Sequence, residues 1–354
     1  MTAILEASRQ RSEHDAPVFP RDAWLIAAQS EELAGRGPIA RVVNDVSLVL
    51  YRDRVGSIAA LENRCPHKNV ALSLGRVQDG VLQCRYHGWR FDAEGRVVDV
   101  PCRSPDERLP NCRVPSFQAA ECDGWIWVNL ASPNAITTQP PRYPRLPDHR
   151  WFERQYVVDA PVDLILENGL DCSHTGFAHE GLFRGAPKQF VTARIEETPT
   201  GVRAETLGED TTGAKDARSI LGRRKAMRHI DEVVLPHTLL VDYWIGDTTH
   251  VQTILVCTPE GPDRTRVYNR TGLRYGRFTA LAALYLRWLV PRVIAQDVEI
   301  LNSQAERIRR FGARDFRAVS ADLAASWMHR AYRRLATGPD DSTPLRRRDV
   351  IYKL

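Results

Sequence analysis

Long apolar segments are scarce in this 354-residue sequence. The longest run, Phe278 to Leu286, stops at Arg287 and is far shorter than the roughly 20 residues that a helix needs to cross a bilayer. We expect this run to be a core-facing part of a long helix. Residues 1–20 are polar and charged and lack the apolar centre of a secretory signal. The sequence therefore predicts a cytoplasmic protein without a membrane span.

Lysine and nucleotide-binding motifs are also scarce. Only five of the 49 basic residues are lysine, and the net charge of +5 is small for this length. No aromatic residues interleave with the arginines in a binding motif, so nucleic-acid binding is not predicted. The glycine-rich fingerprint of dinucleotide-binding folds is absent. A dinucleotide-binding domain is therefore not predicted.

Cysteine is present without the pattern of a disulfide framework. There are seven cysteines with irregular spacing, and a cytoplasmic location would keep thiols reduced. Two of them, Cys65 and Cys84, belong to the motifs described next. The other five are expected to be ordinary buried or half-buried thiols: Cys102, Cys112, Cys122, Cys172 and Cys257.

Two short motifs each place a cysteine beside a histidine. Cys65-Pro66-His67 and Cys84-Arg85-Tyr86-His87 are separated by sixteen residues and give the pattern C-x-H-x16-C-x2-H. In a Rieske [2Fe–2S] cluster two cysteines hold one iron and two histidines hold the other, which is the ligand set offered here. Gly88 would let the second loop pass close to the cluster. A tetrahedral zinc site accepts the same residue types, but it usually pairs cysteine with cysteine and histidine with histidine.

A second candidate metal site lies farther along the chain. Asp171-Cys172-Ser173-His174-Thr175-Gly176-Phe177-Ala178-His179 reads D-x2-H-x4-H and follows Asn168. Two neutral imidazoles and a carboxylate form the facial triad that binds non-haem Fe(II), so His174 and His179 are predicted as ligands. Gly176 is expected to end or distort a helix between them, because side chains five residues apart do not share a helix face. Asp171 would lie on the face of His174 and accept the other N–H of that imidazole.

Together these motifs resemble those of Rieske non-haem iron oxygenase α subunits, over about residues 20–310. The resemblance implies one [2Fe–2S] cluster and one Fe(II) per chain, O2 as a substrate, and electrons from NAD(P)H through a ferredoxin or flavin reductase. In that family an aspartate at the position of Asp171 bridges a cluster histidine of one subunit to an iron-ligating histidine of its neighbour. Electrons would then cross through His67 or His87 and Asp171. An asparagine at the position of Asn168 lies near the iron, and the subunits form a head-to-tail homotrimer.

The third iron ligand must come from elsewhere in the chain. In the family it lies on a late helix, and residues 296–304 are the best match. Ile294, Val298 and Leu301 recur at helical spacing with Asp297, and an acid on an apolar face needs a partner such as iron. We therefore predict Asp297 as the carboxylate ligand. The alternatives that stay open are Glu299, Glu260 and Asp263.

The fold class predicted is α+β, with an all-β Rieske domain first. Short β-like segments at 46–51 and 125–130 suit this domain, which we place at residues 21–132 after a flexible segment at 1–20. Residues 131–150 contain five prolines, so 133–150 is expected to be an extended linker.

The second predicted domain, residues 151–354, holds the iron. Segments 237–245, 249–258 and 264–273 predict an antiparallel meander. A helix at 277–310, kinked or restarted near Pro291, would cover that sheet. This arrangement fits the helix-grip-like catalytic domain that the resemblance implies.

The function that follows is that of a terminal oxygenase component. We expect monooxygenation, by hydroxylation or oxidative demethylation, of an aromatic, polycyclic or alkaloid-like small molecule, because the chain is short and resembles the α-only group. cis-Dihydroxylation and desaturation use the same ligands and stay open. So do a Rieske electron-transfer protein without oxygenase activity and a zinc-stabilised interaction protein. Lys68 and Arg85, beside the cluster, are candidates for docking an acidic electron donor. Candidate pocket residues are Phe177, Phe183, Leu240, Trp244 and Ile254.

Overall fold

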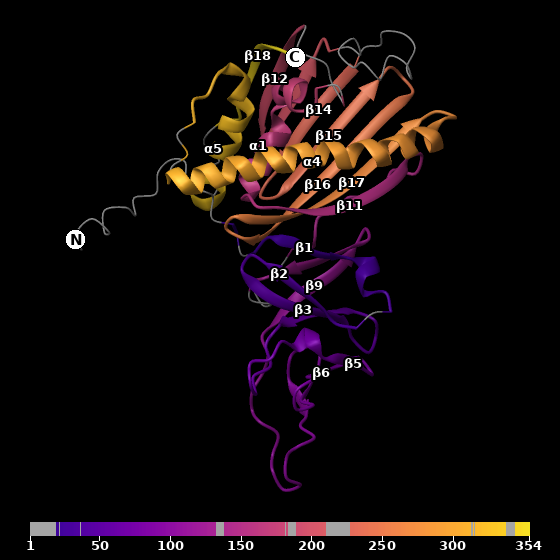
Figure 1. The fold of residues 1–354 in the computed structure, drawn as a ribbon, viewed down its shortest axis with the longest axis vertical. Coiled ribbons are helices and arrows are strands. Elements are labelled where there is room, and N and C mark those ends of the chain that lie inside the picture. Colours follow the sequence, from indigo (N-terminus) through magenta and orange to yellow (C-terminus); the bar gives the residue numbers. More distant parts are fainter. Residues whose placement is uncertain are drawn as a thin grey trace, which may run out of the picture. The chain divides into compact units, whose positions relative to one another are not determined.

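The computed structural model describes residues 19–20, 22–35, 37–131, 138–180, 182, 189–209, 227–312, 314, 316–337 and 344–354. The chain divides into two compact units (Figure 1). One comprises Phe19–Arg145 together with Cys257–Pro262, and the other comprises Leu146–Val256 and Asp263–Leu354.

The unit that contains the cysteine–histidine motifs is built from antiparallel strands. Within its described residues, six strands pair in the order β1-β10-β9-β4-β3-β2 and four in the order β5-β6-β7-β8. The strands are β1 (Trp24–Gln29), β2 (Ile39–Val43), β3 (Val46–Arg52), β4 (Ile58–Glu62), β5 (Arg76–Gln78), β6 (Val81–Gln83), β7 (Arg90–Phe91), β8 (Val97–Asp99), β9 (Ser116–Cys122) and β10 (Trp125–Asn129). Two 3-10 turns, η1 (Ser30–Leu33) and η2 (Leu72–Leu74), complete it. The predicted all-β domain is confirmed, and both predicted strands are present as β3 and β10.

Local sequence explains these strands. β10 reads Trp-Ile-Trp-Val-Asn, and all five residues are buried, as aromatic and β-branched side chains favour in a central strand. Asn44 and Asp45 form the two-residue turn between β2 and β3, both with positive φ, which matches the twist of a tight hairpin. Farther along, the extended segment after residue 137 packs on this unit, where Tyr143 stacks on Trp127. The unit has two core clusters: one joins the two sheets and includes Cys65 and Cys84, and the other is formed by residues of the six-stranded sheet and η1.

The second unit contains one large antiparallel sheet. Its eight strands pair in the order β11-β17-β16-β15-β14-β13-β12-β18. They are β11 (Arg150–Val158), β12 (Phe190–Thr198), β13 (Gly201–Leu207), β14 (Met227–Val234), β15 (Thr238–Ile245), β16 (Thr249–Gly261), β17 (Arg264–Tyr275) and β18 (Arg347–Lys353). The helices are α1 (Val162–Leu170), the 3-10 helix η4 (Cys172–His174), α2 (Thr175–Ala178), α4 (Thr279–Phe311), the 3-10 helix η6 (Ser320–Asp322) and α5 (Leu323–Thr337). The predicted α+β class and meander are confirmed.

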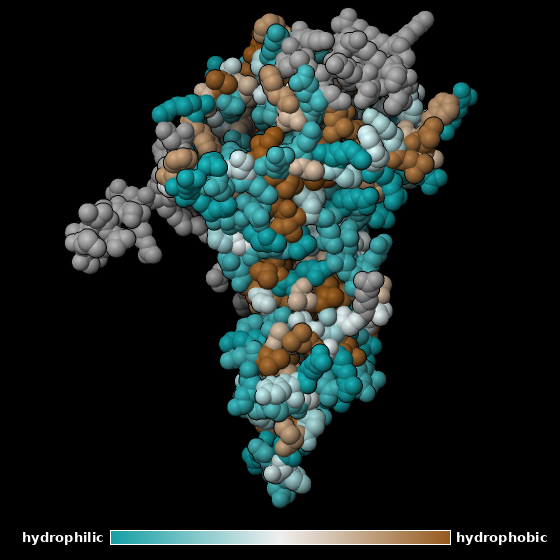
Figure 2. Space-filling view, viewed as in Figure 1, coloured by the Kyte–Doolittle hydropathy of each residue, from teal (hydrophilic) through white to brown (hydrophobic). Residues whose placement is uncertain are grey.

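Helix α4 crosses one face of this sheet (Figure 1). It was expected to be kinked or restarted near Pro291; it continues through that residue, so the restart is wrong and the kink stays a prediction. The apolar run at its start is also not simply core-facing, because Leu281 and Leu284 are 69% and 64% exposed. Apolar residues accordingly gather at this end of α4, on the right of the view (Figure 2).

The length of α4 bears on the expected absence of a membrane span. Gly276–Phe311 is long and apolar enough to cross a bilayer by length and composition alone, and 6% of its apolar window is buried. One such helix is weak evidence for a span, although the core helices that meet the same criterion are mostly buried, unlike this one. The absence of a membrane span stays a prediction.

Candidate functional site

The first site is formed by two loops of the amino-terminal β unit. The loop after β4 closes on itself where the N–H of Cys65 donates to the Val70 carbonyl at 2.8 Å. The loop after β6 closes in the same way, from the N–H of Cys84 to the Trp89 carbonyl at 2.8 Å. Gly88 has φ +75°, and a Cβ there would lie 3.2 Å from the ring of Pro101. The glycine is therefore required by both the turn and its close approach to the neighbouring loop.

The four candidate ligands of this site lie together. The rings of His67 and His87 have centroids 4.5 Å apart, and Trp89 stacks on His67 at 4.9 Å. Cys65 and Cys84 are buried. Burial raises the pKa of the Cys65 thiol to about 11, so a thiolate here needs a cation. Nδ1 of His67 is buried without a hydrogen-bond partner among the described residues. Buried sulfurs and an imidazole nitrogen left unpaired are what a [2Fe–2S] cluster would occupy.

The second site begins where α1 ends. Asp171 has φ −85° and ψ 90°, which breaks the helix, and its carboxylate caps η4 by accepting from the N–H of Ser173 at 2.8 Å. Asp171 and His174 therefore do not share one helix face, contrary to our expectation. Gly176 does not end the helix either, since it is buried inside α2, which ends at Ala178. Between the two histidines the chain passes from the 3-10 helix η4 into α2, and His179 itself leaves helical conformation, with φ −113° and ψ 26°.

Three predicted ligands meet at this point, His174, His179 and Asp297. Oδ1 of Asp297 lies 3.4 Å from Nε2 of His174 and 3.2 Å from Nε2 of His179. Ligand atoms about 2.1 Å from one metal ion are separated by about 3.0–3.5 Å, so these distances suit a shared ion. Asp297 Oδ1 is buried without a hydrogen-bond partner among the described residues. A cation between the three groups would satisfy it.

Hydrogen bonds fix how both imidazoles face the site. Nδ1 of His179 donates to the Gln296 side-chain oxygen at 2.9 Å, and Nδ1 of His174 donates to the backbone carbonyl of Asp171. Because both partners only accept, each Nδ1 must carry the hydrogen, which leaves each Nε2 lone pair for a metal. The partner of His174 is thus the carbonyl of Asp171 and not its carboxylate, whose Oδ2 lies 3.9 Å away.

The imidazoles and the carboxylate of the triad stabilise each other's charged forms even without a metal ion. Burial opposes a charge on His174, but Asp297 and Asp171 together raise the pKa of this imidazole. Burial likewise opposes the charge on Asp297, and the two imidazoles reverse that effect and lower its pKa. A divalent cation would replace the imidazole protons as the partner of the carboxylate.

A cavity of about 770 Å³ adjoins the triad, between α4 and one face of the sheet. All three triad residues line it, as do Asn168 and Asp171. Most other lining residues are aliphatic, among them Leu239, Val251, Leu255, Val293 and Ile294. The arrangement can hold an apolar molecule beside a metal that keeps open positions.

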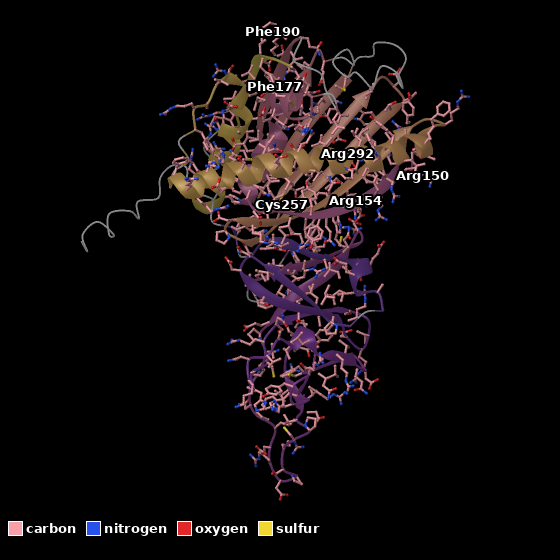
Figure 3. The ribbon with its side chains drawn as sticks, in the orientation of Figure 1. Arg150, Arg154, Phe177, Phe190, Cys257 and Arg292 are labelled. Atoms are coloured by element: carbon pink, nitrogen blue, oxygen red, sulfur yellow. The ribbon has the colours of Figure 1, made fainter. Side chains whose placement is uncertain are left out.

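Four of the five predicted pocket residues do not line the cavity. Odd-numbered residues of β15 and β16 line the cavity, so Leu240, Trp244 and Ile254 occupy the opposite face of the sheet. Trp244 stacks there on His250, with ring centroids 3.7 Å apart. Phe177, on α2, is 72% exposed and does not line the cavity (Figure 3). Phe183 lies outside the described residues.

Sequence reasoning missed a polar cluster in the wall of this cavity. Cys172, Glu209, His229 and Asp231 line it, and all four are buried. The signal was the alternation His229-Ile230-Asp231, which places both polar side chains on one face of β14. Gln296, the partner of His179, was also missed, although it directly precedes Asp297.

Comparison with known protein families defines the class of the chain. The Rieske [2Fe-2S] domain family matches residues 23–118. The vanillate O-demethylase oxygenase C-terminal domain family matches residues 158–337, which is just over half of the chain. The chain therefore belongs to the Rieske oxygenase family with this type of carboxyl-terminal domain, and its first unit is a Rieske domain that carries a [2Fe–2S] cluster.

Individual relatives place the chain within this family. It is 34% identical over 174 residues to the 3-chlorobenzoate-3,4-dioxygenase oxygenase subunit of Comamonas testosteroni, covering 46% of this chain and 38% of that protein. It is 37% identical over 166 residues to the dicamba O-demethylase oxygenase component of Stenotrophomonas maltophilia, covering 46% and 48%. The chain thus spans less than half the length of either relative.

A solved structure, dicamba monooxygenase bound to 3,6 dichlorosalicylic acid, shares the fold. The TM-score is 0.78 at 24% sequence identity, over 90% of this chain and 97% of that one.

Proposed function

We propose that this chain is the terminal oxygenase component of a multi-protein system and monooxygenates a small apolar molecule with O2. The observation that carries the proposal is the triad His174, His179 and Asp297, which lines an apolar cavity in a chain that also has a Rieske domain. The chemical outcome is hydroxylation or oxidative demethylation of an aromatic, polycyclic or alkaloid-like substrate. The O-demethylase among the relatives and the demethylase-type carboxyl-terminal domain support this choice over cis-dihydroxylation or desaturation.

Each candidate ligand has a distinct role. Cys65 and Cys84 would hold one iron of the cluster and His67 and His87 the other. His174, His179 and Asp297 would hold Fe(II) through two Nε2 atoms and a carboxylate oxygen. When bound, the cluster supplies electrons singly and Fe(II) supplies the activation of O2.

The protein's own groups prepare this chemistry. Gln296 and the Asp171 carbonyl hold the hydrogens of the two imidazoles on Nδ1, so that Nε2 faces the metal position. Asn168 lines the same cavity as the triad, where its amide can orient a bound molecule. The aliphatic walls exclude water from the reacting end of the substrate.

The proposed partners follow from the exposed groups. Lys68 and Arg85 are exposed beside the cluster ligands and Tyr86 is 62% exposed, which suits the docking of an acidic ferredoxin or reductase that relays electrons from NAD(P)H. The side chain of Asp171 is 33% exposed, which supports a role as an inter-subunit bridge in a homotrimer. We place the protein in the cytoplasm, where such donors occur. Sedimentation of the purified chain would test the trimer.

Anaerobic metal analysis with EPR of the dithionite-reduced protein tests the function. About three irons and two acid-labile sulfides per chain are expected, with a Rieske signal. His179→Ala should lose one iron and all oxygenase activity while the Rieske signal persists. If the wild-type chain holds only the cluster irons after Fe(II) reconstitution, it is an electron carrier. Zinc without sulfide would refute both the oxygenase and the electron-carrier interpretations.

A further inference from the structure

The first part of α4 presents apolar side chains to solvent. Phe278, directly before the helix, is 51% exposed, and Leu281, Leu284 and Trp288 are 69%, 64% and 49% exposed. Their spacing of three or four residues places them along one side of the helix. We call these four residues the apolar stripe, and apolar atoms gather at this end of α4 in Figure 2. Contiguous exposed apolar surface of this kind indicates a contact with another molecule or with a membrane.

Arginines surround the apolar stripe. Arg277 precedes it, Arg287 lies between its last two residues in sequence, and Arg292 follows it, and all three are exposed. Two more exposed arginines, Arg150 and Arg154, come from β11, which packs against α4. They lie on the α4 side of the sheet, because their register partners on β17 line the cavity (Figure 3). We call the apolar stripe and these five arginines the docking face.

Two of the arginines are held against aromatic rings of the apolar stripe. The guanidinium of Arg277 lies over the ring of Phe278 at 4.8 Å, and that of Arg292 lies over the ring of Trp288 at 4.0 Å. This stacking keeps each positive charge beside an apolar group. Such pairs suit the boundary between lipid headgroups and acyl chains, where the ring is buried and the charge meets phosphate.

The arginines of the docking face lack acidic partners. None of the five forms an ion pair among the described residues. Residues 264–296 contain no aspartate or glutamate. Asp148, two residues before Arg150, is the exposed acid nearest to them in sequence. The docking face therefore carries a net positive charge and would attract an anionic surface.

The cavity that adjoins the triad opens at the docking face. Phe278, Leu281 and Leu284 line this cavity and are nevertheless more than half exposed. Leu281 precedes Asp297 by sixteen residues of one helix, so the opening lies about 24 Å along α4 from the triad. An apolar molecule that entered there would pass from the apolar stripe into the aliphatic cavity without crossing water.

We propose that the docking face binds the surface of an anionic lipid bilayer and that the substrate enters the cavity from that bilayer. The helix would lie on the membrane without crossing it, because its other side packs against the sheet. Membrane binding is independent of the proposed function, whereas the entry of substrate rests on it. The substrate class is thereby narrowed to molecules that dissolve in lipid.

A second copy of the chain and an acidic protein are the competing partners. The subunit contact proposed above uses Asp171, which lies beside His174 at the triad end of the cavity. The apolar stripe begins about 24 Å away along α4 and stays uncovered by that contact. An acidic protein would neutralise the arginines but would also close the opening of the cavity. A bilayer neutralises them and supplies apolar molecules through the opening.

Cosedimentation of the metal-loaded chain with lipid vesicles tests the proposal. Vesicles of phosphatidylcholine alone are compared with vesicles of equal parts phosphatidylcholine and phosphatidylglycerol. The wild-type chain should bind the anionic vesicles about tenfold or more tightly. Raising the salt concentration to about 0.5 M should remove most of this preference, because exposed charges are then screened.

Variants separate the apolar and the charged contributions. Leu281→Glu should lower the affinity for anionic vesicles about tenfold or more, because a carboxylate would replace a side chain that enters the lipid. Replacing both Arg287 and Arg292 by glutamine should lower it by a similar factor. Val319→Glu is the matched control, since Val319 is also 69% exposed but lies beyond the other end of α4. This variant should bind as the wild type.

Entry of substrate from the bilayer has its own readout. Naphthalene dissolved in anionic vesicles serves as the probe, and its transfer to the wild-type chain is followed by fluorescence. Transfer should be faster at low salt, where the chain is bound to the vesicles, than at high salt. Equal rates, or no transfer, would refute entry from the bilayer.

The remaining outcomes decide membrane binding. A wild-type chain without preference for anionic vesicles overturns the proposal, as does a Leu281→Glu chain that binds them within about twofold of the wild type. If Leu281→Glu does not fold, as judged by circular dichroism, the wild-type preference and the arginine variant decide. A lower sedimentation coefficient of lipid-free Leu281→Glu would identify the stripe as a contact between copies and overturn the proposal. Vesicle binding by a chain without oxygenase activity upholds membrane binding and refutes the proposed function.

Discussion

Replacing Gln296 by leucine should weaken Fe(II) binding while leaving the Rieske cluster intact. Gln296 accepts the Nδ1 hydrogen of His179 at 2.9 Å, and His179 is only 2% exposed. Leucine has a similar size but no acceptor, so the imidazole N–H would be buried without a partner. That costs about 1–3 kcal/mol, and about 1.4 kcal/mol corresponds to a tenfold change in affinity. The Kd for Fe(II) should therefore rise about 5- to 150-fold, a range that includes the roughly 10- to 100-fold loss typical when such outer partners are removed.

The assay is an anaerobic titration of Fe(II) into chain depleted of its mononuclear iron, in competition with a chromophoric ferrous chelator. The visible absorbance of the cluster serves as the internal measure of intact protein. Gln296→Glu keeps an acceptor and should bind nearly as the wild type. Glu299→Gln, on an exposed position of the same helix, is the matched control and should have no effect. A Gln296→Leu chain that binds Fe(II) within about twofold of the wild type would refute the reasoning.

Three further outcomes are expected. Gly88→Ala places a side chain at φ +75° beside Pro101, which should lower the stability of the cluster loops by about 1 kcal/mol. The melting curve followed by the absorbance of the cluster should then shift to lower temperature, and an unchanged curve would contradict this. Hydrogen bonds from the Arg142 side chain and from the N–H of Tyr143 lower the pKa of Asp123 below its usual 3.8. The ionised carboxylate therefore adds to the free energy of unfolding above its unfolded pKa, and this contribution is lost as pH falls through the folded pKa. Asp123→Asn should flatten that acid limb in denaturant titrations from pH 6 to pH 3, and a limb of wild-type steepness would count against it. Asp171→Asn should retain both metals yet lose about tenfold or more of turnover, and full activity would exclude Asp171 from the electron route.

The metal ligands could be predicted because their signals are local or periodic. Cys65 and His67 share one tight loop, as do Cys84 and His87, and no long-range packing is needed to bring each pair together. Asp297 is distant in sequence from His174, yet its place on an apolar helix face indicated that it faces the interior. The resemblance to Rieske non-haem iron oxygenases then indicated that the two sites serve one reaction.

The pocket walls could not be predicted, because strand register is set by pairing and not by local sequence. In β15 both faces are apolar, with Leu239 toward the cavity and Leu240 away from it, so alternation gives no direction. The polar alternation of His229 and Asp231 would normally indicate a solvent face. Here both are buried, because Cys172 and Glu209 complete their contacts from distant parts of the chain.

Asp171 shows how one residue can serve two purposes at separate atoms. Its carbonyl accepts from His174 and so fixes the tautomer of an iron ligand, a task that any residue in this backbone conformation can perform. Its carboxylate holds the cap of η4 through Oδ1, and asparagine can accept the same hydrogen bond from Ser173. Neither of these two hydrogen bonds therefore requires the negative charge. The side chain stays 33% exposed and lines the cavity, where its charge also acts on His174, and this exposure is compatible with the inter-subunit bridge that we propose.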